Sequence, residues 1–200
     1  MTEASRNPRR GRPRTEGTRA AVVQALIALV AEQGFAKTSM DEVAERAGVS
    51  KATIYRRWPS KDALIVDAHR ALLDTTDAPD TGTLRGDLLA LLDRVADVME
   101  QPQITGMMQA SVGEMMANAE LGEVFRQQVM EPRLQMIHAV FARAHERGDL
   151  RPGVDWRTAA YSLIGSNVFR VAFMGEPPDR DANRRLVEMI ARDAEVEREH

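Results

Sequence analysis

Hydrogen-bond donors and cations dominate one short stretch of the sequence, between Ser50 and Lys61. The side chains there that could bind an anion are Lys51, Thr53, Tyr55, Arg56, Arg57 and Lys61. No acidic residue interrupts them. A helix that is merely solvated usually mixes both charges, whereas a surface that binds phosphates needs cations, because each neutralised phosphate releases counterions. These residue types therefore favour nucleic acid as the partner.

The charge of the chain is divided unevenly along its 200 residues. Residues 1–61 contain 12 Lys and Arg against 6 Asp and Glu, whereas residues 62–200 contain 15 against 24. The net charge of −3 thus hides a basic head on an acidic body. Such an asymmetry indicates an anion-binding segment joined to a larger unit, and an inert charged surface is the alternative.

The elements that must position these donors are helices. Apolar residues recur with helical spacing along most of the chain, as Val23, Leu26, Ile27 and Val30 do, and no convincing alternating strand is found. Residues 74–83 have the composition of a loop and mark the place where the charge changes sign. We expect an all-α fold of about nine helices, four of them in the first third of the chain.

Two short helices are expected to meet at the sequence "AGVS", residues 47–50. Gly48 permits the turn, and the small Ala44 one turn earlier leaves room for the next helix. This is the pattern of a helix-turn-helix, in which the second helix enters the major groove of DNA. A structural corner with no role in DNA binding is the alternative, and the donors that follow the corner favour DNA.

Residues 39–64, "SMDEVAERAGVSKATIYRRWPSKDAL", closely resemble the DNA-binding domain of the TetR/AcrR family of bacterial transcriptional regulators. The resemblance covers roughly residues 15–65, and beyond them it is one of helical layout only. It implies a three-helix helix-turn-helix DNA-binding domain over residues 15–62. A larger helical domain for effector binding and dimerisation would follow over residues 63–200.

The resemblance also implies which residues touch DNA. Lys51, Ala52 and Thr53, at the start of the second helix of the motif, would face base edges. Bases or nearby phosphates would be touched by Tyr55 and Arg56. Thr38, Ser39 and Lys61 lie near helix N-termini and would hold phosphates. Free amides and the helix dipole favour anions at such positions. Arg57 departs from the aromatic residue common in the family, and Trp58 is expected in the core.

A basic arm is expected over residues 1–14. Its "RRGRPR" segment, residues 9–14, resembles an AT-hook, whose arginines lie in the narrow minor groove of A·T-rich DNA. Glycine and proline keep such a segment out of a helix. We expect a flexible arm in which Arg12 contacts DNA without reading its sequence. A true reader of A·T-rich DNA and a solvated tail are the alternatives.

Apolar residues surround most of the predicted helix "VDWRTAAYSLIGSNVFRVAFM", residues 154–174. A helix that is apolar on more than one side must bury two faces, and one of them can meet a twofold-related copy. The predicted dimer interface is Tyr161, Gly165, Ser166, Phe169, Phe173, Leu186, Met189 and Ile190. Complete burial within one subunit is the alternative.

Seven of the eleven methionines lie between Met99 and Met136. Because methionine is flexible and polarizable, a cluster of it can line a cavity that adapts to apolar ligands. The predicted pocket is lined by Met99, Met107, Met115, Met116, Phe125, Met136 and Phe141. Core packing at helical spacing is the alternative, while the family resemblance independently implies a small-molecule site in the body.

Enzyme chemistry finds little support in the sequence. The chain has no cysteine, which excludes thiolate metal sites and cysteine nucleophiles. His138 and His145 are separated by ~10.5 Å along a helix, too far to share a metal, and no phosphate-binding glycine loop or hydrolase motif occurs. We expect no catalytic residue, no cofactor and no metal site.

The prediction is a homodimeric regulator in the cytoplasm, a repressor released from a palindromic operator by a small apolar effector. No apolar run approaches the ~20 residues that cross a bilayer, so no membrane partner is expected. Two alternatives stay open at this stage. One is an architectural DNA-binding protein without an effector, and the other is a helical small-molecule enzyme or carrier.

Overall fold

The computed structural model describes residues 14–72 and 77–196, and for residues 14–16 only the backbone. The head comprises α1 (Arg14–Gln33), α2 (Met40–Arg46) and α3 (Lys51–Arg57), and α4 (Lys61–Leu72) follows. The body contains α5 (Leu84–Met99), α6 (Pro102–Ala117), α7 (Ala119–Phe125), α8 (Glu131–Glu146), α9 (Trp156–Val168) and α10 (Arg180–Ala194). Two π-helical turns are η1 (Arg126–Met130) and η2 (Phe169–Phe173).

The all-α prediction is confirmed. Since η1 joins α7 to α8 and η2 extends α9, the ten α-helices of the described residues form nine continuous helical segments. The described chain contains no strand, only an isolated antiparallel bridge between Leu150 and Glu195. Among these residues, no helix is both long enough and apolar enough to cross a bilayer.

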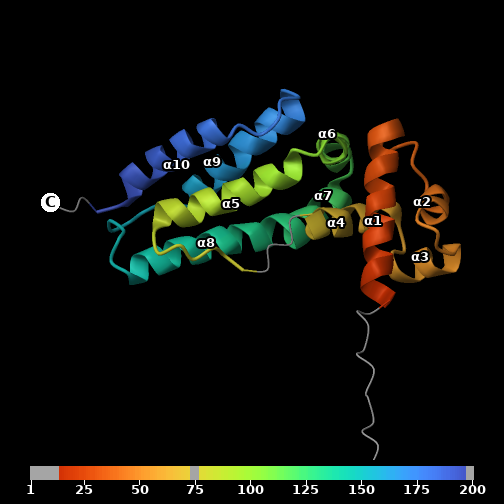
Figure 1. The fold of residues 1–200 in the computed structure, drawn as a ribbon, viewed down its shortest axis with the longest axis horizontal. Helices are drawn as coiled ribbons and strands as arrows, with labels where there is room; N and C mark the ends of the chain where they lie inside the picture. The colour runs from red at the N-terminus through yellow and green to blue at the C-terminus, as the bar shows by residue number, and fades with distance from the viewer. Residues whose placement is uncertain (1–13, 73–76, 197–200) are drawn as a thin grey trace, which may run out of the picture.

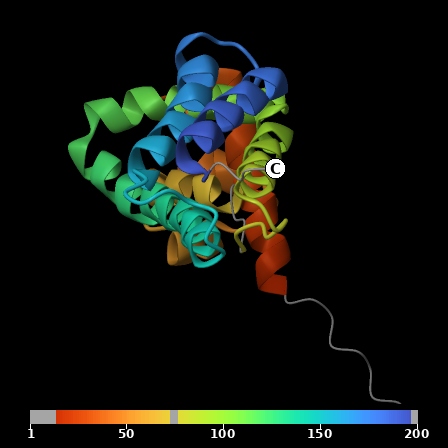
Figure 2. The same ribbon diagram turned by 90° about the vertical axis from the view of Figure 1, so that its left-hand side faces the viewer.

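Head and body occupy opposite ends of an elongated molecule (Figure 1). In the head, α1 runs across the long axis, with α2 and α3 on its outer side. In the body, α5, α8, α9 and α10 run along that axis and pack side by side, as the view from the body end also shows (Figure 2). The helix that leads from the head into the body is α4.

Short-range capping explains why the head helices begin where they do. Ser39 and Glu42 form a capping box: the Ser39 hydroxyl accepts from the Glu42 amide, and the Glu42 carboxylate accepts from the Ser39 amide. Ser50 accepts from the Thr53 amide and Ser60 from the Ala63 amide. Each cap satisfies an amide that the first helical turn leaves free.

Two apolar clusters make up the core. The first contains the fully buried Leu26, Ile54 and Leu64 of the head and α4, and it continues into the body through Met107. The second lies among α5, α8, α9 and α10. The first cluster contains residues from both sides of the predicted domain boundary between residues 62 and 63. Head and body therefore share buried surface. The domain boundary at that point stays a prediction.

His69 of α4 is a buried titratable group in the first cluster. Its Nε2 atom lies 3.0 Å from the Ser111 hydroxyl, and its ring meets that of Phe125 edge-on at 5.0 Å. Burial, and secondarily the positive charge of Arg133, lowers the pKa of His69 to about 3. The imidazole is therefore neutral in the folded protein near neutral pH.

This burial predicts an acid-dependent loss of stability. The unfolded chain protonates His69 below its ordinary pKa of about 6.5, whereas the folded chain does not, so the free energy of unfolding falls as the pH drops. The His69 contribution between about pH 7.5 and about pH 5.5 is about 1.4 kcal/mol. Urea unfolding at both pH values should show this loss in the wild type and its absence in His69→Leu. The exposed His145→Gln serves as the control, and an unchanged pH dependence in His69→Leu would contradict the assignment.

Candidate nucleic-acid interface

The corner between α2 and α3 is built as the sequence pattern predicts. Gly48 has φ of 66°, a left-handed conformation that favours glycine. The Val49 amide donates to the Ala44 carbonyl at 2.9 Å, which closes the turn. Ala44 is buried, and Val43 and Ile54 pack behind it in the core. The corner therefore fixes the direction in which α3 leaves α2.

Almost all of α3 faces solvent. Ile54 is its one buried residue, whereas Lys51, Ala52, Tyr55 and Arg56 are exposed and Thr53 is half-buried. Tyr55 keeps 48% of its surface accessible, a large exposure for an aromatic side chain. All five predicted base-facing or phosphate-facing residues of α3 thus lie on an accessible surface, and their contacts with DNA stay predictions.

Lys51 has a partner within the head. Its ammonium forms an exposed ion pair with Asp41 of α2, and this pairing raises the pKa of Lys51. Exposed ion pairs contribute little to stability. Lys51 can therefore exchange Asp41 for a base or a phosphate at small cost.

Two predicted phosphate contacts are corrected by the geometry. Thr38 is 2% exposed, and its hydroxyl donates to the Gly34 carbonyl at 2.9 Å, so its side chain cannot reach DNA. The Lys61 ammonium donates to the Phe35 and Thr38 carbonyls at 2.6 and 2.9 Å. Lys61 therefore has a structural role in the turn after α1. Ser39 is exposed, although its hydroxyl is engaged with Glu42.

A carboxylate on α4 holds the head together. Asp67 accepts two hydrogen bonds from the Arg19 guanidinium of α1, at 3.0 and 2.8 Å, and one from the Trp58 indole at 3.0 Å. Burial alone would raise the pKa of Asp67, but the hydrogen bonds from Arg19 and Trp58 outweigh it, and the net pKa is lowered. Trp58 is the C-cap residue of α3 and is buried as predicted. Sequence spacing gives no signal for this contact, because Arg19 and Asp67 are 48 residues apart.

Arg12 and most of the predicted basic arm lie outside the described residues. Arg14 already belongs to α1. Arg57 is exposed, and its guanidinium lies 5.1 Å from the centre of the Trp58 ring. The structure thus places Arg57 beside the end of α3 without assigning it a contact to DNA.

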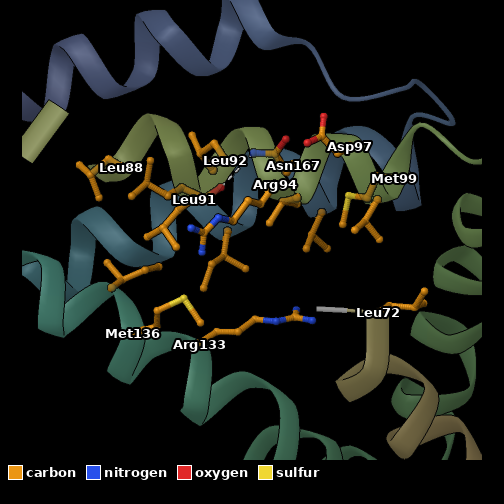
Figure 3. A pocket seen from close by; sticks show the side chains of 16 residues that line it. Leu72, Leu88, Leu91, Leu92, Arg94, Asp97, Met99, Arg133, Met136 and Asn167 are labelled. Atoms are coloured by element: carbon orange, nitrogen blue, oxygen red, sulfur yellow. Dashed lines mark hydrogen bonds between the residues drawn. The ribbon is translucent and has the colours of Figure 1, made fainter. Parts of the chain in front are cut away.

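The body contains a cavity of about 340 Å³ between α5, α8 and α9, next to Leu72 at the end of α4 (Figure 3). Leucine, isoleucine and valine side chains form most of its wall. Of the seven predicted pocket residues, only Met99 and Met136 line it. Arg133 and Asn167 also line the cavity and were not predicted. Arg133 could have been found from the sequence, because it lies one helical turn before the predicted pocket residue Met136.

The other five residues predicted to line a pocket do not line this cavity. Met107 is completely buried in the first core cluster, and Phe141 is buried in the second. Met115 and Phe125 line a crevice with no room for a ligand. Met116 is 77% exposed. For Met107 and Phe141, the structure thus agrees with the alternative interpretation, in which residues at helical spacing pack in the core.

An exposed apolar face runs over α9, η2 and α10. Tyr161, Phe169, Phe173 and Met189 are each more than half exposed, and the rings of Phe169 and Phe173 stack at 5.8 Å. Gly165 and Ser166 are exposed between them, whereas Leu186 and Ile190 are half-buried against the second cluster. Complete burial of this surface within one subunit is therefore excluded, and its role in a dimer stays a prediction.

Both parts of the chain match families of known proteins. Residues 22–68 match the family described as "Bacterial regulatory proteins, tetR family", and residues 78–190 match "Tetracyclin repressor-like, C-terminal domain". This is a DNA-binding transcriptional regulator of the helix-turn-helix type and not an enzyme. The chain belongs to the TetR family.

Relatives match over nearly the whole chain. An uncharacterized HTH-type regulator of Bacillus subtilis, YdeS, is 31% identical over 180 residues, 90% of each chain. The DNA-binding transcriptional repressor TetR of Mycobacteroides abscessus is 32% identical over 187 residues, 90% of this chain and 93% of that protein. The crystal structure of the TetR family regulator SCO0332 is 33% identical, covers 88% of this chain and 97% of its own, and has a TM-score of 0.69.

The structural role of Lys61 predicts two separable results for Lys61→Met. The free energy of unfolding should fall by about 1–3 kcal/mol, because the Phe35 and Thr38 carbonyls each lose a charged donor. The slope of log binding constant against log salt concentration should stay unchanged, whereas loss of a phosphate contact would reduce it by about one. Urea unfolding and fluorescence anisotropy on a DNA fragment that carries the binding site measure both quantities.

The matched control for Lys61→Met is Arg56→Met. It removes an exposed cation from α3 and should reduce the salt slope with little change in stability. If Lys61→Met instead reduced the slope by about one and kept its stability, the structural role of Lys61 would be refuted.

Proposed function

We propose that the protein is a homodimeric repressor that binds a palindromic operator and is released from it by a small molecule. The observation that carries the proposal is the surface of α3, which presents Lys51, Tyr55 and Arg56 to solvent and buries Ile54 alone. A helix of this kind at a fixed corner suits insertion into a major groove. The residues proposed to contact bases or phosphates are Ser39 at the start of α2 and, on α3, Lys51, Ala52, Thr53, Tyr55 and Arg56.

Dimerisation follows from the limited reading capacity of one such helix. A single helix-turn-helix reads few base pairs, so two copies bind half-sites ~34–36 Å apart. The exposed aromatic face of α9 and η2 is the surface proposed to join the copies, since soluble monomers rarely leave a contiguous apolar patch of this kind uncovered.

The route from an effector to the operator passes through α4. Its Asp67 is bound to Arg19 and to Trp58 at the end of α3, whereas its Leu72 lines the body cavity. A ligand that prefers a different position of α4 therefore changes the position of α3. Typical couplings of ~1–3 kcal/mol weaken binding roughly 5- to 150-fold, which is enough for a switch. Repression rather than activation is supported by the relative from Mycobacteroides abscessus, which is a transcriptional repressor.

Removing the two long side chains of α3 tests the proposal. The double variant Tyr55→Ala/Arg56→Ala should lose operator affinity by at least about 30-fold, because each lost base or phosphate contact costs about 1–3 kcal/mol. Circular dichroism and thermal unfolding should stay close to wild type, because both side chains are exposed. The control is Arg46→Ala, which removes an exposed cation from α2. Unchanged DNA affinity in the double variant would contradict the proposal.

Footprinting of the wild type separates the regulator from an architectural DNA-binding protein. The regulator protects a palindrome with two half-sites spaced by one helical turn. An architectural protein that relies on a basic arm protects A·T-rich DNA diffusely.

A further inference from the structure

A half-buried arginine lies in the wall of the body cavity and has one buried nitrogen without a hydrogen-bond partner among the described residues. That nitrogen is the Nη2 atom of Arg133, on α8. Burial lowers the pKa of Arg133 to about 10. The guanidinium is still charged at neutral pH. A buried charge without a counter-ion is costly, so this position favours an anion.

The other charged groups at the cavity do not supply that anion. The Asp97 carboxylate is 68% exposed and shares the Arg180 guanidinium with Asp93 and Glu100, so it lies largely in solvent and does not pair with Arg133. Arg94, on the opposite wall from Arg133, donates to the Asp77 carbonyl at 3.0 Å and adds a second positive charge (Figure 3). A cationic ligand would therefore be repelled from the cavity.

The remainder of the wall is apolar. Figure 3 shows Leu88, Leu91 and Leu92 of α5 along one side and Arg133 with Met136 of α8 along the other. The volume of about 340 Å³ lies at the small end of the ~300–1,000 Å³ range of ligand pockets. It suits a single hydrocarbon chain of medium length or a compact ring, and it leaves no room for a large conjugate.

We propose that this cavity binds a small carboxylic acid with an apolar body, whose carboxylate pairs with Arg133 and whose hydrocarbon part lies among the leucine side chains of α5. The proposal rests on the proposed function and specifies the chemical class of its effector. A carboxylate supplies the acceptor that the buried Nη2 atom lacks, and such charge-assisted hydrogen bonds are the strong ones. A neutral ligand of the same shape leaves Arg133 unpaired.

The charged end of the cavity is also the end next to α4. The Arg133 guanidinium points toward Leu72 (Figure 3), and its charge contributes to the lowered pKa of His69. A carboxylate bound at Arg133 therefore lies beside the helix that carries Asp67. This places the polar contact of the ligand where it acts most directly on the head.

Three unbranched ten-carbon probes test the charge preference: decanoate, 1-decanol and decylamine. Isothermal titration of the full-length wild type should show binding of decanoate, at least about 10-fold weaker binding of 1-decanol, and no binding of decylamine. Decanoate should also raise the melting temperature, because it binds the folded state. Equal affinities for decanoate and 1-decanol, or no binding of decanoate, would overturn the proposal.

The variant Arg133→Met identifies the residue. It should weaken decanoate binding about 10- to 100-fold and leave 1-decanol binding unchanged or improved, whereas Arg133→Lys should restore part of the loss. The fold should survive, because an apolar side chain replaces an unpaired buried charge, and the melting temperature checks this. Met136→Leu, one turn further on the same wall, is the matched control and should keep most of the decanoate affinity. If Arg133→Met bound decanoate as wild type does, the assignment would fail.

Operator binding, measured in parallel by anisotropy, separates this proposal from the proposed function. Absence of decanoate binding together with normal operator binding refutes the carboxylate ligand only. Decanoate binding that depends on Arg133, together with operator affinity that survives Tyr55→Ala/Arg56→Ala, refutes the proposed function only.

Discussion

The carboxylate of Asp67 is the point at which three parts of the head are held to one another. It binds Arg19 of α1 through two hydrogen bonds and Trp58 at the end of α3 through a third. With only seven residues and one buried side chain, α3 cannot define its own position. Its orientation depends on the corner at Gly48 at one end and on Trp58, bound to α4, at the other. The DNA-reading surface is therefore as rigid as its attachment to α4.

The same helix is part of the body. His69 of α4 is buried against Ser111 and Phe125, and Leu72 borders the cavity. The head also shares its core with the body through Met107, so the two cannot move as independent units. In the proposed switch, a ligand in the cavity acts on α4 at one end, and α4 acts on α3 through Asp67 at the other. The coupling thus needs no element besides one helix with contacts on both sides.

Local sequence signals predicted the parts of this structure that depend on local interactions. The turn at Gly48 and the burial of Trp58 each follow from neighbouring residues, and the structure confirms them. Helical spacing also predicted the exposed aromatic residues of α9 and η2 as a surface. It could not show which partner covers a given apolar face, and so the methionines of α6 were assigned to a cavity although Met107 packs in the core.

Contacts between segments that are far apart in the sequence could not be predicted either, because local spacing does not show which segments meet. Lys61 was expected to point to a phosphate, but its direction is set by carbonyl groups 26 and 23 residues earlier in the chain. Arg133 was not predicted as a pocket residue, and only the packing of α5 and α9 against α8 shows that its Nη2 atom is buried at the cavity. The resemblance to the TetR/AcrR family supplied the architecture, and this architecture does not specify the lining of the cavity.

The most direct test of the account is the distance between the two recognition helices in the dimer bound to its operator. The chain has no cysteine, so Arg57→Cys, at the exposed end of α3, can carry a single spin label per subunit. Pulsed electron paramagnetic resonance should give one narrow distance between subunits, close to the ~34–36 Å that separates successive major grooves. No distance between subunits, or a broad distribution without a maximum there, would contradict the account.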